Sequence, residues 1–156
     1  MTTALSIAAI LISALTFLWT IAWSIHTHRS ATEPQLKVEG AYSIPVYGPR
    51  LGEPALSMTV TNTGAVTITI TSARFRIDGE KETLAPIDWV MQTPRELPVV
   101  LAPGEHWTAL ADAASMRGSL VRQYGDRRDW RLRPTVSDSA NREYLSTEWL
   151  TLTAQE

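Results

Sequence analysis

The chain contains no cysteine, which excludes a disulfide-stapled scaffold, a zinc site built on thiolates and a cysteine nucleophile. It also lacks a large excess of either charge, because 14 lysines and arginines stand against 16 aspartates and glutamates in 156 residues. The basic balance typical of nucleic-acid-binding proteins is therefore missing, and we expect no nucleic-acid partner. Only two of the basic residues are lysines. This arginine bias, together with plentiful alanine, is typical of high-GC bacteria and their phages.

Several motifs that support catalysis are missing as well. The sequence has no Walker loop, no dinucleotide-binding glycine pattern, no H-E-x-x-H, no EF-hand loop and no G-x-S-x-G elbow. His26 and His28 could begin a metal site with Glu33, but solvated imidazoles in a linker account for them better, and His106 stands alone. We therefore predict no enzymatic activity, no catalytic residue, no metal and no cofactor.

The first 25 residues contain no charged side chain. As a helix, the 22 residues of 4–25 would extend ~33 Å, close to the ~30 Å hydrocarbon core of a bilayer. This pattern predicts a transmembrane helix over 4–25, with Trp19, Trp23 and Arg29 as anchors at the membrane interface. A cleaved signal peptide fits less well, because the stretch has no basic start and no small-residue cleavage site.

The flanks of this stretch bear on orientation and assembly. Arg29 and Lys37 follow it while no basic side chain precedes it, and basic residues favour the cytoplasmic side. We expect a single-pass protein of the cell membrane with a cytoplasmic domain, the external orientation being the alternative. Small residues four positions apart, such as Ala4 and Ala8, would permit weak homo-oligomerisation through the helix, although alanine-rich segments contain such pairs by chance.

Beyond a polar linker at 26–35, apolar residues alternate with polar ones, as they do in half-buried strands. The clearest run is 66–70, where valine and isoleucine alternate with threonine. After this run the apolar phase slips by one residue, to Phe75 and Ile77, which predicts a β-bulge within the strand.

One helix interrupts the strands. Asp112 is suited to cap a helix over about 113–124, and Gly125 is suited to end it. With about seven strands joined by short links, the pattern predicts a mainly β fold, an antiparallel immunoglobulin-like sandwich over 36–154 with one short crossover helix. We expect the four tryptophans of this domain in its core, and one that lay exposed would instead mark a partner site. They are Trp89, Trp107, Trp130 and Trp149.

Two turn motifs resemble those of bacterial immunoglobulin-like sandwiches. Val60-Thr61-Asn62-Thr63-Gly64 leads into the threonine-rich strand, and Leu101-Ala102-Pro103-Gly104-Glu105 follows about 40 residues later. Over 55–154 the chain is similar to cell-adhesion-related domains and to small membrane-tethered β-domains of high-GC bacteria and their phages. The resemblance implies a sandwich fold and carries no chemistry.

Charge is unevenly distributed along the domain. Residues 33–112 carry 10 acidic and 6 basic side chains, whereas 115–142 carry 7 arginines and 3 aspartates. Gathered on one face, these arginines would suit anionic headgroups or an acidic protein partner, and a mixed surface with local Asp–Arg pairs is the alternative. The candidate partner-facing residues are Arg117, Arg122, Arg127, Arg128 and Arg131.

These features together predict a non-enzymatic, membrane-tethered interaction or scaffolding module, whose partners are the lipid bilayer and another protein. One alternative is a small phage-encoded or envelope effector that acts through its membrane helix. Another is a membrane-bound hydrolase, which would need a pocket that gathers at least three ionisable groups from distant strands.

Overall fold

The computed structural model describes residues 12–24, 33–44, 46–47, 50–51, 53–86, 89–125, 127 and 129–153. The chain divides into two units, Met1–Glu33 and Pro34–Glu156. As predicted, the second unit is mainly β and its sheets are antiparallel.

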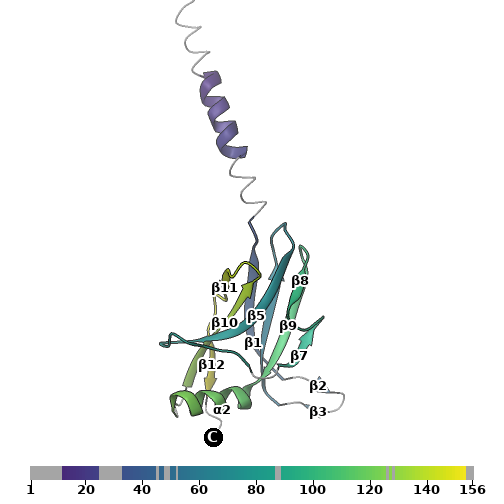
Figure 1. Cartoon of the computed structure of the whole chain (residues 1–156), viewed down its shortest axis with the longest axis vertical. Helices are drawn as coiled ribbons and strands as arrows, with labels where there is room; N and C mark the ends of the chain where they lie inside the picture. Colours follow the sequence, from purple (N-terminus) through teal and green to yellow (C-terminus); the bar gives the residue numbers. More distant parts are fainter. Residues whose placement is uncertain are drawn as a thin grey trace, which may run out of the picture. The chain divides into compact units, whose positions relative to one another are not determined.

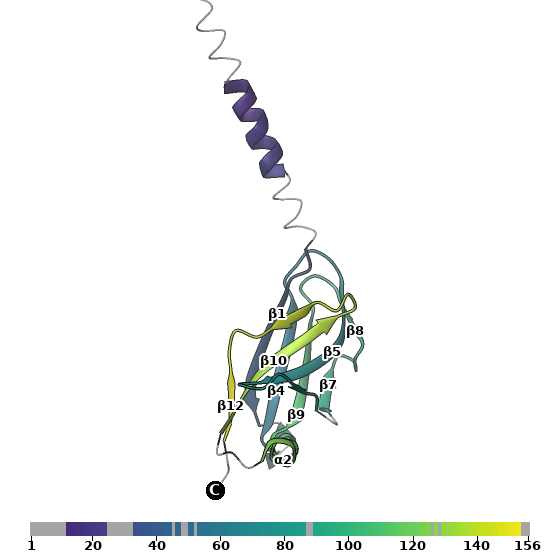
Figure 2. The ribbon, with the colours of Figure 1, turned by 60° about the vertical axis from the view of Figure 1, so that its left-hand side comes forward.

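Two sheets of the second unit face one another as a sandwich (Figures 1 and 2). The first has the order β1 (Leu36–Ser43), β4 (Ala55–Asn62), β9 (His106–Asp112), β7 (Trp89–Thr93). The second is built on β5 (Ile68–Ile77) and β10 (Asp129–Asp138), with β11 (Glu143–Leu145) and β12 (Leu150–Thr153) on β10, and β6 (Thr83–Leu84) and β8 (Val99–Leu101) on β5. A separate hairpin pairs β2 (Val46–Tyr47) with β3 (Arg50–Leu51).

The described residues thus form twelve strands where about seven were expected. Five of the extra or divided elements are only two or three residues long. Such short segments do not produce a readable alternation in the sequence.

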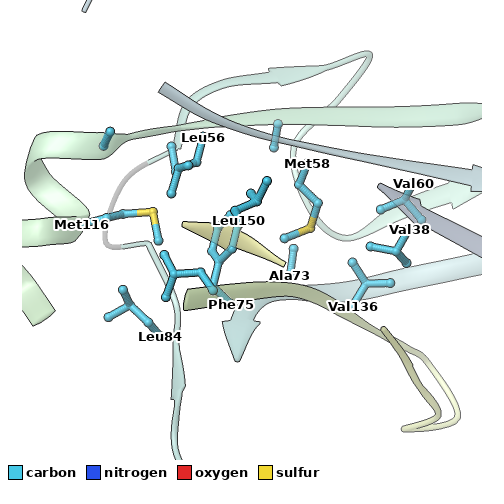
Figure 3. Packing of buried hydrophobic residues seen from close by; sticks show 14 of the residues in the cluster. Val38, Leu56, Met58, Val60, Ala73, Phe75, Leu84, Met116, Val136 and Leu150 are labelled. Carbon is cyan, nitrogen blue, oxygen red and sulfur yellow. The ribbon is translucent and has the colours of Figure 1, made fainter. Parts of the chain in front are cut away.

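Side chains from both sheets meet between them (Figure 3). Leu56, Met58 and Val60 alternate along β4 and are fully buried, and Phe75 and Val136 reach the same core from β5 and β10. Burial of one such side chain contributes ~1.5–3 kcal/mol, so this cluster is the main source of stability.

The predicted helix is confirmed as α2 (Ala113–Tyr124), which lies across one end of the sandwich (Figure 1). The carboxylate of Asp112 accepts a hydrogen bond from the Ser115 amide at 2.7 Å, and Gly125 ends the helix with a positive φ of 83°. Met116 and Leu120 are buried, so the helix closes the core between β9 and β10.

The predicted bulge in β5 is confirmed as well. Ser72 is paired with Ser137 of β10, but the next residue of β10, Asp138, is paired with Ile70, which leaves Thr71 as the extra residue. The Thr71 hydroxyl lies 3.2 Å from the carbonyl oxygens of both Ser137 and Asp138. Because of this extra residue, the buried positions of β5 are even-numbered before the bulge, as at Ile70, and odd-numbered after it, as at Phe75 and Ile77.

Asn62 joins the two turn motifs on which the resemblance rests. Its side-chain amide donates to the carbonyls of Val66 at 2.8 Å and Leu101 at 2.9 Å. Its backbone N–H donates to the Glu105 carbonyl at 2.9 Å, and its carbonyl accepts from Gly104 at 2.8 Å. Asn62 is fully buried, so its polar groups need these partners.

Gly40 lets β1 approach the second sheet closely. A β-carbon at this position would lie 2.5 Å from Cγ of Pro134 and 3.0 Å from Cδ1 of Leu150. Any larger residue would therefore force β1 and β10 apart.

The turn between β10 and β11 is built around one buried carboxylate. Asp138 accepts hydrogen bonds from Nε of Arg142 at 2.7 Å, from the Tyr144 hydroxyl at 3.1 Å and from the backbone amides of Ala140 and Arg142. Burial raises the pKa of Asp138, but these donors outweigh it, and the pKa lies below its ordinary value. Burial raises the pKa of Tyr144, and the hydrogen bond to the negatively charged Asp138 raises it further.

In the described part of the first unit, residues 12–24 are helical. None of the helices in the described ranges is both long and apolar enough to cross a membrane. This corrects the expectation of a transmembrane helix over 4–25, which was drawn from the apolar character of the stretch alone. Residues 1–11 and 25–32 lie outside the described residues.

Candidate interaction surface

Four arginines share the outer side of β5 and β10. In β5 the buried residues after the bulge are Phe75 and Ile77, and in β10 they include Leu132. Because side chains alternate along a strand, the residues between them point away from the core. We call these residues the arginine face: Arg74, Arg76, Arg131 and Arg133.

The register of the two strands sets Arg76 directly opposite Arg133. Side chains at directly opposed positions lie ~4.5–5.5 Å apart at their β-carbons, and like charges there are destabilising. Two arginines opposed in this way depart from the usual pairing of a sheet, and departures of this kind are expected at functional sites.

Arg131 and Arg133 are held in place by their neighbours. The Cζ atoms of Arg131 and Arg133 lie 5.3 Å and 5.6 Å from the ring centroid of Trp149. Arg131 also pairs with Asp78 at 3.2 Å, and Nε of Arg133 donates to the Ser146 carbonyl.

The remaining two arginines differ from each other. Arg74 is half-buried, and its guanidinium donates to the hydroxyls of Ser72 at 3.3 Å and Ser137 at 3.0 Å. Arg76 is exposed. Within the described ranges, Asp78 is the one carboxylate that forms an ion pair with a member of the arginine face. The face therefore has an unbalanced positive charge.

Trp149 corrects one of the core expectations. Trp107 and Trp130 are buried, and Trp89 packs on the core beside Phe75, but Trp149 is half-exposed on the arginine face. Trp149 follows the short strand β11, where the chain turns back before β12.

The structure does not gather the predicted basic residues on one face. Arg117 lines a cavity at the end of the sandwich, and Arg122 on α2 donates to the Ser119 hydroxyl at 3.2 Å. Arg127 pairs with Glu80 at 3.0 Å and lies over the Trp130 ring. Of the predicted set, only Arg131 belongs to the arginine face. Arg128 lies outside the described residues.

The predicted membrane anchors were Trp19, Trp23 and Arg29. Trp19 and Trp23 lie on the N-terminal helix, 71% and 60% exposed, with ring centroids 6.4 Å apart. Arg29 lies outside the described residues, as do His26 and His28. No three potential metal-ligating side chains come together in the part of the chain that the structure describes.

A cavity of about 470 Å³ opens where α2 meets the ends of β1 and β12. Its walls combine apolar groups such as Leu152, and the hydroxyl of Thr153, with four ionisable side chains. These four are Tyr42, Glu53, Asp112 and Arg117. The Tyr42 hydroxyl donates to the Thr151 carbonyl, and partial burial raises the pKa of Tyr42. The carboxylate of Asp112 caps α2, so Tyr42 and Asp112 both serve structural hydrogen bonds.

The sequence did not predict that Arg74, Arg76 and Arg133 lie on one face. A local signal for it exists: Arg74-Phe75-Arg76 and Arg131-Leu132-Arg133 both alternate arginine with a core residue. Two such strands present their arginines together only if they are neighbours, and nothing local in the sequence fixes that pairing.

No protein-family model matches this chain, and no curated protein is similar enough to it to count as a match.

Proposed function

We propose that the β domain is a non-enzymatic interaction module that binds a negatively charged surface of a partner protein through the arginine face. The observation that supports this most is the opposition of Arg76 and Arg133 at the centre of the sheet. No carboxylate among the described residues forms an ion pair with either of them. A partner's carboxylates would supply the missing counter-charge, and arginine forms bidentate hydrogen bonds with carboxylates.

Trp149 adds a second line of support. Aromatic and arginine side chains are enriched at the hot spots of protein interfaces, the few residues that contribute most of the binding free energy. Here one half-exposed tryptophan lies against two arginines, an arrangement that combines apolar area with charge. Because contacts already restrict Arg74, Arg131 and Arg133, binding would cost less side-chain entropy.

We also propose that the domain is immunoglobulin-like in type. In chain order, the first sheet follows the pattern first, second, fifth and fourth major strand, and the second sheet pairs the third, sixth and seventh. This is the arrangement of strands A-B-E-D and C-F-G in immunoglobulin domains. Folds of this class often bind proteins, but the fold alone assigns no activity.

Photocrosslinking tests the proposed interaction. Thr151 is an exposed residue of β12 that is paired with Arg131 of β10. A photoreactive phenylalanine derivative at Thr151 should give adducts with a partner protein in native cells. The same probe at His106, exposed on the first sheet, serves as the control. Adducts at Thr151 should disappear when Arg76 and Arg133 are both replaced by serine. Equal adducts at both positions, or adducts that survive the double substitution, would refute the proposal.

A second candidate function, the binding of a small molecule, is supported by the cavity beside α2. Its volume lies in the range of small-molecule sites, ~300–1,000 Å³, and it gathers ionisable groups from separate elements, of which two, Tyr42 and Asp112, lie on strands. Replacing Gly118, which lines the cavity, with leucine should fill part of it and abolish any small-molecule binding, while leaving binding through the arginine face unchanged. A loss of photocrosslinks at Thr151 in this variant would favour the cavity over the arginine face.

Association of the chain with the cell membrane stays a prediction that no structural feature tests. It rests on the charge-free sequence of the first 25 residues and needs no spanning helix. Sedimentation of the full-length protein with membranes, compared with a variant carrying aspartate at Leu15 and Leu18, measures it directly. Recovery of the parent protein in the supernatant would contradict it.

A further inference from the structure

The arginine face is a regular array as well as a charged patch. The register places Arg74 opposite Thr135, Arg76 opposite Arg133, and Asp78 beside Arg131, at three successive outward positions along the strand pair. Successive outward positions on a strand are ~6.8 Å apart, so the array extends ~14 Å along the strands. Its positive charge is greatest in the middle, where two arginines share one position.

We infer that this array binds an extended acidic segment of the partner, with carboxylates at alternate residues. This inference rests on the proposed function. An extended chain repeats the side chains of one face every ~6.8 Å, the same spacing as the array. Three carboxylates at positions i, i+2 and i+4 would therefore each meet a guanidinium. The central carboxylate would lie between Arg76 and Arg133 and relieve their mutual repulsion.

At one end of the array, Asp78 already occupies the guanidinium of Arg131. Its carboxylate is 3.2 Å from Arg131, and both side chains are about half exposed, 47% and 56% respectively. A ligand carboxylate at this end must compete with Asp78 for the same guanidinium. Removing the charge of Asp78 should therefore strengthen binding of an acidic segment, an effect opposite in sign to that of removing an arginine.

Single-stranded nucleic acid fits the face less well than an acidic segment does. Its bases bind by stacking on exposed aromatic rings, but the ring of Trp149 on this face is partly buried and lies against the guanidinium groups of Arg131 and Arg133. The chain as a whole also carries a formal charge of −2, which opposes the long-range attraction on which polyanion binding depends.

Two peptides of equal composition test the inference on the full-length chain. The peptide TETETET carries three glutamates on one face when extended, whereas TTEEETT carries two on one face and one on the other. Fluorescence anisotropy of the labelled peptides at low ionic strength should show ~threefold tighter binding of the alternating peptide, the value of about one exposed ion pair. Arg76→Gln should weaken its binding ~threefold, and Asp78→Asn should strengthen it by a similar factor.

The matched control is Arg95→Gln, which removes the same charge from an exposed site on the loop after β7 and should leave peptide binding unchanged. Circular dichroism confirms that each variant is folded. If the protein binds both peptides equally and the Arg76→Gln variant binds neither, the alternating spacing is refuted while the proposed function stays intact. Binding of oligothymidylate or phosphatidylserine vesicles, with neither peptide bound, would refute the acidic segment itself.

Discussion

Reversing the charge of Arg76 should stabilise the domain while it abolishes binding of acidic partners. In the native protein Arg76 and Arg133 are directly opposed, and a like-charged pair at such a position costs as much as an opposite pair contributes, ~0.2–1 kcal/mol. Arg76→Glu both removes the repulsion and creates an attraction, so the free energy of unfolding should rise by ~1 kcal/mol. Arg76→Gln removes only the repulsion and should give about half of this gain.

Thermal unfolding followed by circular dichroism measures the effect. For a domain of this size, ~1 kcal/mol corresponds to a rise in Tm of ~3–5 °C. Since the pair is exposed to solvent, the gain should shrink at high salt, where the Debye length falls to ~3 Å. An unchanged or lower Tm for Arg76→Glu at low salt would show that the two guanidinium groups do not repel one another. The opposed arginines would then be no evidence for a binding site.

Three further substitutions test the fold that presents the arginine face. Gly40→Ala should destabilise the domain by ~1–3 kcal/mol in chemical denaturation, because the new methyl group meets Pro134; a neutral result would contradict the close approach of β1. Asn62→Ala should cost ~2–4 kcal/mol, since two buried carbonyls lose their donor, and the loss of stability should appear in the same assay. The pKa of Asp138 is lower in the folded than in the unfolded state, so its contribution to stability is present above its ordinary pKa of ~3.9 and is lost as the pH falls through the folded value. Asp138→Asn should therefore lower stability at pH ~7 and reduce the further loss on acidification, and an unchanged pH profile would show that Arg142 does not stabilise the carboxylate.

Local features of the chain could be predicted from the sequence because their causes are local. The cap at Asp112 and the glycine at 125 define α2, and the slip in the apolar phase locates the bulge of β5 to within two residues. Alternation identified the long strands, but it could not identify strands of two or three residues, which are defined by their partners and not by their own pattern.

The site depended on information that the sequence does not display. Charge density along the chain pointed to 115–142, but folding distributes those arginines between a cavity, an ion pair and a sheet. The arginine face joins residues about 60 positions apart through the register of β5 and β10. The expectation of a transmembrane helix rested on apolar composition alone, and no helix among the described residues is both long and apolar enough to cross a membrane.

The bulge at Thr71 absorbs one additional residue, so β5 keeps its pairing with β10 on both sides of it. Deleting Thr71 would leave Ile70 and Ser72 paired with Asp138 and Ser137 in a regular ladder, with Arg74 and Arg76 still facing outward and Phe75 and Ile77 inward. Loss of a second residue between Ile70 and Phe75 would have no bulge to absorb it and would turn the arginines toward the core. Among related chains, the alternation of arginines with core residues would therefore reveal a preserved interface better than the residue count between Ile70 and Phe75.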